Sequence, residues 1–310
     1  MKKYKNIDII FRLWYNIKEV RKMNYITIRE ASILWGISER RIRQLIQDGR
    51  IEEAKKIGNT WSIPENTTKP IDKRYKIEEE KNNVMDFLQN NKSYFEDFIT
   101  RSTYHSNAIE GNTLTYAETY ALLFNDNKFI IDKKTPREIY EAINHKKAME
   151  HVLEKINSDY SDLTLGFIKE LGIIINENIS DIDGFRTVQV LIVGAEHIPS
   201  RPEQVPNLMN YFIANYNNDS EENIFNKIAK YHIEYESIHP FQDGNGRTGR
   251  LLINYELIKN NIPPAVIDVE NRTRYYELLR EKNIKELSKW LEELSNQELE
   301  RMKIIGYKGE

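Results

Sequence analysis

The residues best suited to chemistry in this sequence stand in one run, from His239 to Arg250. The run reads His-Pro-Phe-Gln-Asp-Gly-Asn-Gly-Arg-Thr-Gly-Arg, and it combines the groups needed to handle a polyphosphate. His239 has an ordinary pKa of about 6.5, so at neutral pH it is available to take a proton from a hydroxyl. Asp243 offers a carboxylate oxygen of the kind that Mg²⁺ accepts beside substrate phosphates.

The glycine-rich centre of this run predicts an anion-binding loop. Residues 244–246 read Gly-Asn-Gly and accept left-handed backbone conformations, so that successive N–H groups can converge on an anion. Residues 247–258 predict a helix whose positive dipole end would face the same anion. Arg247 and Arg250 fall on one face of that helix, and a guanidinium binds phosphate oxygens through a planar fork.

Apolar residues at helical spacing predict a mainly α-helical chain with buried helices on both sides of the run. Residues 224–238 repeat apolar side chains at a period of about 3.6 and lead directly into His239. His145 and His151 lie among Lys and Glu residues and are expected at the surface. Further helices are predicted over residues 84–99, 113–125, 135–156, 163–176, 205–216, 271–282 and 284–304.

One segment departs from the helical pattern. Residues 182–195 are rich in β-branched side chains with partial alternation, which predicts a β-hairpin. The segment from Thr187 to Val193 is the best candidate for its exposed edge.

Composition bounds the class of protein. The 310 residues suffice for one large or two unequal domains. The absence of cysteine excludes disulfides, thiolate metal sites and cysteine catalysis. No apolar run reaches the roughly 18 residues of a membrane-spanning helix. The start is basic, but the apolar stretch that follows it, residues 9–11, is soon interrupted by Arg12, and no small-residue cleavage site follows. This argues against a signal peptide, so the cytoplasm is the expected location.

The first part of the chain predicts a small module of its own. Residues 1–22 predict an amphipathic helix. A helix over residues 27–35, with Thr27 as N-cap, is followed by a Gly-Ile-Ser turn and a second helix over residues 39–47. Residues 50–63 then alternate like a short hairpin, with its turn at Gly58. The pattern resembles the winged helix-turn-helix of excisionase-like and MerR-like DNA-binding proteins.

The charge of this module favours an anionic partner. Residues 1–70 hold 15 Lys and Arg against 8 Asp and Glu, whereas the remaining residues hold 30 against 40. If the second helix reads the major groove of DNA, the side chains expected to face the bases are Arg40, Arg41, Arg43 and Gln44. A solvated basic helix that serves protein contacts is the alternative interpretation.

The run from His239 to Arg250 resembles the signature of the Fic family, His-Pro-Phe-x-Asp/Glu-Gly-Asn-Gly-Arg-x-x-Arg, and matches every fixed position. The resemblance implies transfer of AMP from ATP to a Ser, Thr or Tyr hydroxyl of a protein. It implies His239 as general base and Asp243 as the Mg²⁺ ligand. Phe241 is expected to anchor the loop in the core. The resemblance also implies a phosphate-binding set, made of Gly244, Asn245, Gly246, Arg247 and Arg250.

A second stretch resembles the Fic inhibitory motif, Ser/Thr-x-x-x-Glu-Gly/Asn, within a predicted helix at about residues 101–112. Ser106, Glu110 and Gly111 match it. The resemblance implies that Glu110 pairs with the second arginine of the signature, Arg250, and so places negative charge where a γ-phosphate would bind. A helix that ends in a glycine cap is the plainer interpretation of the same residues.

The resemblance also assigns roles outside the two motifs. The hairpin at about residues 185–198 corresponds to the Fic flap, which aligns a target segment by main-chain pairing. Tyr275 or Tyr276 would wall the adenine, with Tyr276 the preferred choice and core packing the alternative.

Together these observations predict a mainly α fold with two domains. Residues 1–70 would hold the N-terminal helix and winged helix-turn-helix, and residues 71–310 a Fic domain. The expected function is an ATP- and Mg²⁺-dependent protein adenylyltransferase, inhibited by Glu110 and acting on an unidentified protein, with DNA as a second partner. Two alternatives stay open: removal of AMP at the same site, and a DNA-binding regulator with a nucleotide-sensing Fic body.

Overall fold

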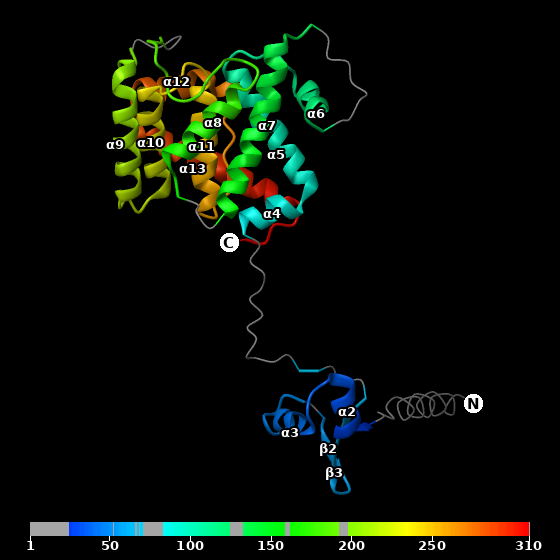
Figure 1. Cartoon of the computed structure of the whole chain (residues 1–310). Helices are drawn as coiled ribbons and strands as arrows, with labels where there is room; N and C mark the ends of the chain where they lie inside the picture. Colours follow the sequence, from blue (N-terminus) through cyan, green and yellow to red (C-terminus); the bar gives the residue numbers. More distant parts are fainter. Residues whose placement is uncertain are drawn as a thin grey trace, which may run out of the picture. The chain divides into compact units, whose positions relative to one another are not determined.

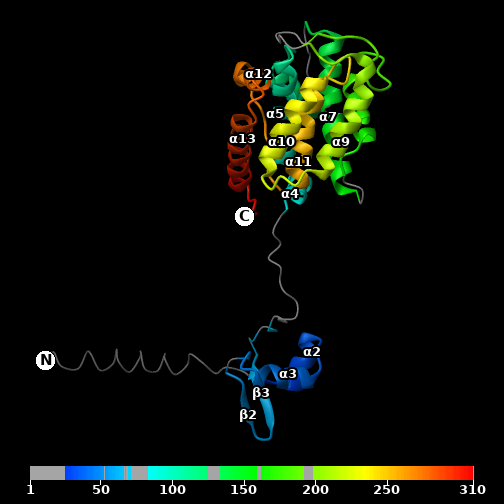
Figure 2. The same cartoon turned by 90° about the vertical axis from the view of Figure 1, so that its left-hand side faces the viewer.

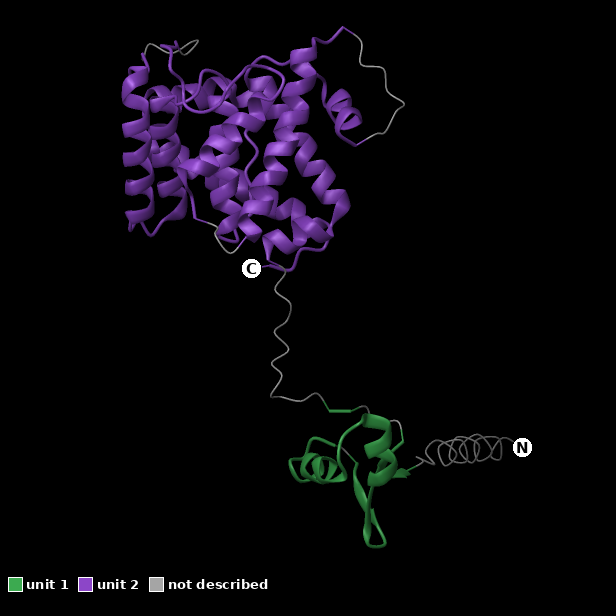
Figure 3. Ribbon diagram, in the orientation of Figure 1, with its two compact units in different colours: residues 1–80 green, residues 81–310 purple. Residues whose placement is uncertain are grey.

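The structure is a computed structural model, and the chain divides into two compact units, residues 1–80 and 81–310 (Figure 3). The sequence placed the domain boundary at residue 70, whereas the first compact unit ends at residue 80. The helix predicted for residues 1–22 lies outside the described residues. The structure describes residues 25–51, 53–65, 67, 69–70, 83–124, 133–158, 162–191 and 198–309.

The first unit is a three-stranded antiparallel sheet with two helices. Its strand order is β1-β3-β2, with Ile26 opposite Ile63 and Lys56 opposite Trp61. The sequence did not predict β1, because three residues are too short to show alternation. The elements are β1 (Tyr25–Thr27), α2 (Ile28–Trp35), α3 (Glu39–Gln47), β2 (Lys55–Ile57) and β3 (Thr60–Pro64).

Local capping explains where the two helices begin and end. The Thr27 side chain accepts from the Glu30 N–H at 3.2 Å, and Glu30 accepts from the Thr27 N–H at 2.7 Å, which is the reciprocal capping box. Gly36 closes α2 at φ 63°, and Ser38 caps α3. The predicted helix bounds are therefore confirmed. The apolar faces form one small core, in which the buried residues are Ile28, Ala31, Trp35, Ile42, Leu45, Ile51 and Ile63.

The second unit is helical throughout its regular secondary structure in the described residues (Figure 1). The helix predicted over residues 84–99 is two helices, because the Asn91 side chain accepts from the Tyr94 N–H at 3.0 Å and starts a new one. The elements are α4 (Val84–Asn90), α5 (Lys92–Ile109), α6 (Tyr116–Phe124), α7 (Pro136–Asn157), α8 (Leu165–Asn176), η1 (Pro202–Gln204), α9 (Val205–Asn218), α10 (Ile224–Ile238), α11 (Asn245–Lys259), η2 (Val269–Asn271), α12 (Arg272–Arg280) and α13 (Ile284–Ile304).

Helix α11 is the centre of this unit. It packs against α4, α5, α7, α8 and α10, and the last three surround it in Figures 1 and 2. Of its 15 residues, 13 are buried, which is the pattern of a core helix rather than an amphipathic one. Because α11 begins directly after the glycine-rich loop, this packing holds the loop and both motif arginines in fixed positions.

The predicted hairpin is not seen in the residues described there. Residues 183–191 form bends and irregular backbone without a strand, and residues 192–197 lie outside the described chain. Side-chain burial does not alternate there: residues 187–189 and Leu191 are exposed, Val190 is half-buried and Arg186 is buried. The partial alternation of residue types therefore does not correspond to a strand in this part of the chain.

Phe241 anchors the loop in the core, as expected. Its side chain is fully buried and packs on the Phe185 ring, with 5.7 Å between ring centroids. On its other side lies Gly172 of α8, where an added Cβ would stand 2.3 Å from the Phe241 ring. A helix backbone therefore contacts an aromatic ring directly, and only glycine fits between them.

We expect Gly172→Ala to destabilise the protein by about 1 to 3 kcal/mol, because the buried ring has no free space into which to move. Gly166→Ala is the matched control on the same helix, since the nearest atom to its added Cβ is 3.8 Å away. That control should be neutral or slightly stabilising. Denaturant unfolding of the two variants measures the difference, and equal midpoints would contradict the contact.

None of the helices that the structure describes is both long enough and apolar enough to span a membrane.

Candidate active site

The motif loop joins α10 to α11 through two left-handed residues. His239 caps α10 at φ 53° and ψ 64°, and Gly244 caps α11 at φ 79°. Between them, the Asn245 side chain accepts from the Phe241 N–H at 2.8 Å and donates to the Phe241 carbonyl at 2.9 Å. Both ends of the Asn245 amide are thereby used to brace the loop.

This geometry corrects the expected form of the phosphate cradle. Of residues 244–246, Gly244 alone is left-handed, while Asn245 and Gly246 are the first residues of α11. The first helical bond runs from the Thr248 N–H to the Gly244 carbonyl at 2.9 Å, so the N–H groups of residues 245–247 have no partner within the helix. The anion-binding groups are thus a helix N-terminus rather than a run of left-handed residues.

Glu110 lies against this helix end. An added Cβ on Gly246 would stand 2.4 Å from Glu110 Oε1 and 3.0 Å from Arg250 Nη1. Glu110 is the cap of α5, which the following Gly111 closes at φ 98°. The glycine cap and the acidic contact are therefore both present, and the former positions the latter.

Arg250 holds Glu110 and the end of α5 together. Its guanidinium donates to the Ser106 hydroxyl at 3.0 Å, to the Ser106 carbonyl at 2.8 Å and to Glu110 Oε1 at 2.8 Å. The Arg250 side chain is 6% exposed and that of Glu110 is 32% exposed. Burial by itself would lower the pKa of the Arg250 guanidinium. The Glu110 carboxylate more than compensates, so the pKa of Arg250 is raised. The pair that the sequence suggested between α5 and α11 is formed.

Arg247 points to a different neighbour. Its guanidinium donates to Asp243 Oδ1 at 3.1 Å and lies 3.4 Å from Glu141 Oε1 on α7. Arg137, also on α7, donates to Asp243 Oδ2 and to Glu141 Oε1. Arg137 and Glu141 were not among the predicted site residues, since one helical turn of α7 carries no motif that would mark them.

His239 is mostly buried beside these charges. Burial lowers the pKa of the His239 imidazole to about 4, and the positive charge of Arg186 acts in the same direction. A backbone interaction with Glu236 and the carboxylates of Glu110 and Asp243 oppose that shift. The ring is therefore neutral at neutral pH, which is the form able to accept a proton.

A layer of buried polar side chains lies beside the Arg250 guanidinium. His232 Nε2 lies 2.8 Å from the Tyr275 hydroxyl, and the Arg250 guanidinium stands 5.7 Å from the centroid of the Tyr275 ring. Glu236 is buried near Gly249, and this burial raises its pKa to about 8. A neutral Glu236 therefore accompanies Arg250 at pH 7, and Glu110 remains its hydrogen-bonded carboxylate.

His145 also belongs to this layer, so its predicted surface position is wrong. It is 1% exposed, and its Nδ1 lies 3.1 Å from the Thr103 hydroxyl. Burial, followed by the charges of Arg250 and Arg247, lowers the pKa of His145 to about 3. The charged neighbours in sequence misled because α7 turns His145 toward α5 and α11.

The two candidate adenine-binding tyrosines separate in the structure. Tyr275 is 1% exposed and belongs to the core. Tyr276 is partly buried, and its hydroxyl donates to the Ile109 carbonyl at 3.3 Å, one residue before Glu110. Tyr276 thus lies beside the C-terminal end of α5, next to Glu110.

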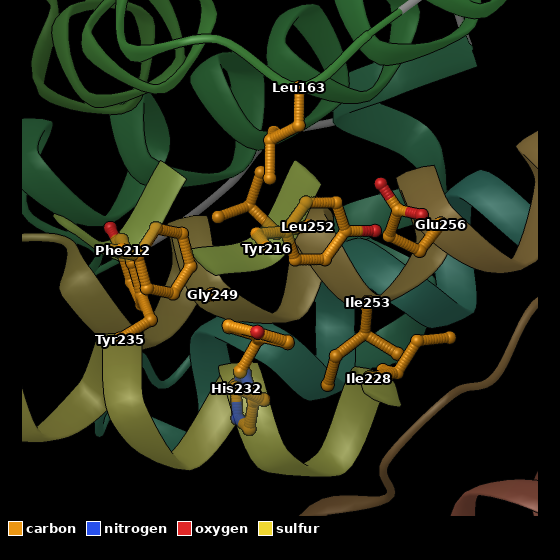
Figure 4. Close-up of a pocket in the computed structure, with 11 residues that line it drawn as sticks. Leu163, Phe212, Tyr216, Ile228, His232, Tyr235, Gly249, Leu252, Ile253 and Glu256 are labelled. Carbon is orange, nitrogen blue, oxygen red and sulfur yellow. The ribbon is translucent and has the colours of Figure 1, made fainter. Parts of the chain in front are cut away.

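The pocket behind α11 is not a nucleotide site. It has a volume of about 30 Å³, far below the roughly 300 Å³ of a small-molecule pocket. Its walls are core side chains from α9, α10 and α11, including Phe212, Tyr235 and Leu252 (Figure 4). The space belongs to the packing that supports His232 and Gly249.

Asp243 is the residue that fits a magnesium ion. No cluster of three or more metal-ligating side chains occurs in the described ranges. Burial raises the pKa of Asp243, but the charges of Arg247 and Arg137 lower it by more. The net pKa therefore lies below its usual value, and the carboxylate is charged. One carboxylate beside an anion-binding helix end suits Mg²⁺, which commonly takes one protein ligand together with phosphates.

The predicted DNA-reading residues lie on one exposed helix, α3. Arg40, Arg43 and Gln44 are exposed and Arg41 is half-buried. Arg43 pairs with Glu39 at 2.9 Å, and Gln44 donates to Asp48 at 3.2 Å. These bonds are at the solvent-facing surface, where such pairs are weak and exchange readily.

The site thus combines the N-terminus of the buried helix α11, two arginines and a neutral histidine, an arrangement that suits an anion. Residues 162–257 match the model of the Fic/DOC family. The matched span includes the whole run from His239 to Arg250, whereas Glu110 and Tyr276 lie outside it.

Individual proteins agree with this assignment. The chain is 34% identical over 185 residues to protein adenylyltransferase Fic of Aedes aegypti, covering 58% of this chain and 36% of that protein. A Fic domain-containing signalling protein of Bacteroides thetaiotaomicron superposes with a TM-score of 0.61 at 25% identity, over 68% of this chain and 88% of that one. Fic-1 of C. elegans superposes at 0.60 with 27% identity, over 72% and 65%. The chain spans little more than a third of the length of the Aedes relative.

Proposed function

We propose that the protein is an ATP-dependent adenylyltransferase that modifies a hydroxyl of a protein. The observation that carries the proposal is the anion-binding end of α11, where Arg247 and Arg250 flank free N–H groups next to a neutral His239. The similarity to proteins named protein adenylyltransferase Fic supports the same reaction.

In this reaction the hydroxyl oxygen of the target attacks the α-phosphorus of ATP. His239 takes the hydroxyl proton, the bond between the α-phosphorus and the bridging oxygen breaks, and pyrophosphate leaves. The N-terminus of α11 and Arg247 stabilise the negative charge that develops on the phosphate oxygens. Asp243 would hold Mg²⁺, which neutralises charge on the leaving pyrophosphate when bound.

Glu110 is proposed to inhibit this reaction. Its carboxylate occupies the guanidinium face of Arg250 that a γ-phosphate would use, at 2.8 Å. Two anions cannot share that face without strong repulsion, so ATP would bind with its phosphates displaced from the line of attack. The inhibition is intramolecular, because α5 and α11 belong to the same compact unit.

The proposed function is tested by incubating wild type, Glu110→Gly, His239→Ala and the Glu110→Gly/His239→Ala double variant with α-labelled ATP and Mg²⁺, followed by intact-mass measurement of added AMP. Label on the Glu110→Gly protein that is missing from the Glu110→Gly/His239→Ala double variant supports adenylylation. If no variant is labelled but an AMP-modified protein loses its AMP in the presence of wild type, the chain instead catalyses hydrolytic removal of AMP at the same site.

We propose a second function for the first unit, binding of duplex DNA through α3. The exposed Arg40 and Arg43 and the excess of basic residues in residues 1–70 favour it. The cytoplasm, where both a protein target and DNA are available, remains the expected location. A regulator that senses nucleotide through its Fic domain would use the same two sites.

Arg40→Ala/Arg43→Ala should weaken binding of the full chain to a mixed-sequence DNA duplex and lower the slope of log affinity against log salt by up to about 2, one for each lost phosphate contact. Lys285→Ala/Lys289→Ala on α13 removes the same charge from exposed positions of the other unit and should leave the slope unchanged. Fluorescence anisotropy across a salt series measures both. Equal slopes in the two double variants would exclude α3 from the DNA interface.

A further inference from the structure

Arg186 is a buried cation with an unusual set of partners. It lies at the start of the segment predicted as the flap, about residues 185–198, and is 4% exposed. Its Nε donates to the His239 carbonyl at 2.8 Å, and its Nη2 lies 3.4 Å from the Ile238 carbonyl. Its own backbone N–H donates to the Pro240 carbonyl at 2.8 Å. Three consecutive carbonyls at the start of the motif loop therefore accept from one residue.

The same guanidinium also binds both ends of the following surface segment. Nη1 donates to the Val188 carbonyl at 3.1 Å, and Nη2 donates to the Ser200 carbonyl. Val188 lies near the start of the predicted flap, and Ser200 lies two residues beyond its end. One planar group thus links the motif loop to the two ends of the segment expected to present the target.

The charge of Arg186 is not matched by an ion pair within the part of the chain that the structure describes. Burial lowers the pKa of its guanidinium, and the more distant Glu203 only partly opposes this. Its hydrogen-bond acceptors are all backbone carbonyls, including those at the negative end of α10. Burying a cation without a carboxylate is costly for a purely structural contact, which points to a role in positioning.

His239 is the residue most affected by these bonds. Its left-handed backbone, at φ 53°, is unfavourable for a residue with a side chain and persists only where neighbouring contacts enforce it. Arg186 supplies such contacts on both sides of the His239 Cα, through the carbonyls of Ile238 and His239. The direction of the imidazole therefore depends on Arg186.

We propose that Arg186 is a positioning residue, which fixes the His239 backbone and the two ends of the target-presenting segment in one rigid arrangement, so that base and target hydroxyl meet. The role of aligning a hydroxyl rests on the adenylyltransferase function proposed above. The rigid link between the motif loop and the segment does not, because it is a property of the fold.

The test compares Arg186→Gln and Arg186→Lys in the Glu110→Gly background. Arg186→Gln should lower kcat by roughly 100-fold, as expected for a reacting group displaced by about 1 Å, with KM for ATP changed less than about threefold. Arg186→Lys keeps the charge but cannot reach the four carbonyls that the guanidinium contacts, so it should restore only part of kcat. Arg201→Gln, an exposed arginine beside Ser200, is the control and should keep full activity.

Two readouts do not require activity. The pKa of His239, followed by NMR of its ring, should rise in Arg186→Gln and stay low in Arg186→Lys, because removal of the cation leaves burial opposed by Asp243 and the Glu236 backbone. Amide exchange of residues 186–191 and 198–200 should accelerate in both variants. If the parent Glu110→Gly is inactive, the adenylyltransferase proposal fails and these two readouts still judge Arg186.

A folded Arg186→Gln with unchanged kcat, or with unchanged His239 pKa and amide exchange, would overturn the proposal. Parallel loss of kcat, ATP binding and thermal stability in both variants would show that Arg186 only supports the fold, and would overturn it as well. If Arg186→Gln does not fold, Arg186→Lys decides, since a full rate with unchanged exchange in that variant contradicts positioning.

Discussion

Replacement of Glu110 by glycine is expected to raise the rate of AMP transfer about 10- to 100-fold, the usual size of a coupling between an inhibitory contact and a binding site. The variant removes the carboxylate that accepts from Arg250 at 2.8 Å and leaves the Ser106 bonds that hold the guanidinium in place. Arg250 is then free to bind the terminal phosphate. Initial rates with labelled ATP at saturating Mg²⁺ measure the gain.

The same change should alter nucleotide preference. Wild type should bind ATP and ADP with similar affinity, because Glu110 occupies the place of the γ-phosphate. Glu110→Gly should bind ATP more tightly than ADP, since only ATP reaches the freed face of Arg250. Isothermal titration with a non-hydrolysable ATP analogue separates this effect from turnover.

Controls distinguish loss of the carboxylate from loosening of the helix end. Ala108→Gly adds a glycine to the same turn of α5 but keeps the ion pair, so its rate should match wild type. Glu110→Gln removes charge but keeps volume and should fall between wild type and Glu110→Gly. A rate increase in Ala108→Gly as large as that in Glu110→Gly would refute inhibition by the carboxylate.

Replacement of His239 by alanine should lower transfer about 10²- to 10⁴-fold in the Glu110→Gly background, the range typical for loss of a general base. ATP affinity should stay within a few fold, because the phosphate-binding groups belong to α11. His151→Ala is the matched control. His151 Nε2 lies 3.0 Å from Glu170 Oε2, in an ion pair that does not involve the motif loop. Equal rates in the two variants would remove His239 from the mechanism.

The pH dependence of kcat/KM reports the same base. Because the pKa of His239 is lowered to about 4, the neutral ring is fully present at neutral pH and is lost only as the pH falls through that value. The rate should therefore be flat from pH 8 to about pH 6 and decline well below it. A fall in kcat/KM with an apparent pKa of about 6.5, the ordinary value for histidine, would contradict a buried, neutral base.

Much of the helical framework could be predicted because its signals are local. The last helix, α13, has the predicted bounds, Ile284–Ile304, and the second helix of the first unit, α3, coincides with residues 39–47. Apolar spacing defines their buried faces, and a capping side chain marks where each begins. Where a cap interrupts an apolar pattern, as Asn91 does, the prediction of one helix instead of two was wrong.

The predictions also failed where a local pattern had two physical causes. The β-branched pattern around Val188 predicted a strand, but the described residues there are irregular and mostly exposed, and charged neighbours in sequence did not place His145 at the surface. The left-handed backbone predicted for residues 244–246 occurs at Gly244, whereas Asn245 and Gly246 are the first residues of α11. Only packing against neighbouring helices decides between such outcomes.

The sequence by itself contained the residues that we propose carry the chemistry: the base, the carboxylate, the arginines and the acidic residue that faces them, all within two short motifs. The tertiary structure alone decided how these groups are supported. Arg137 reaches Asp243 across 106 positions, and Arg186 reaches His239 across 53. Contacts over such separations leave no periodicity or spacing in the sequence, because they arise only when packed helices bring distant backbone and side chains together.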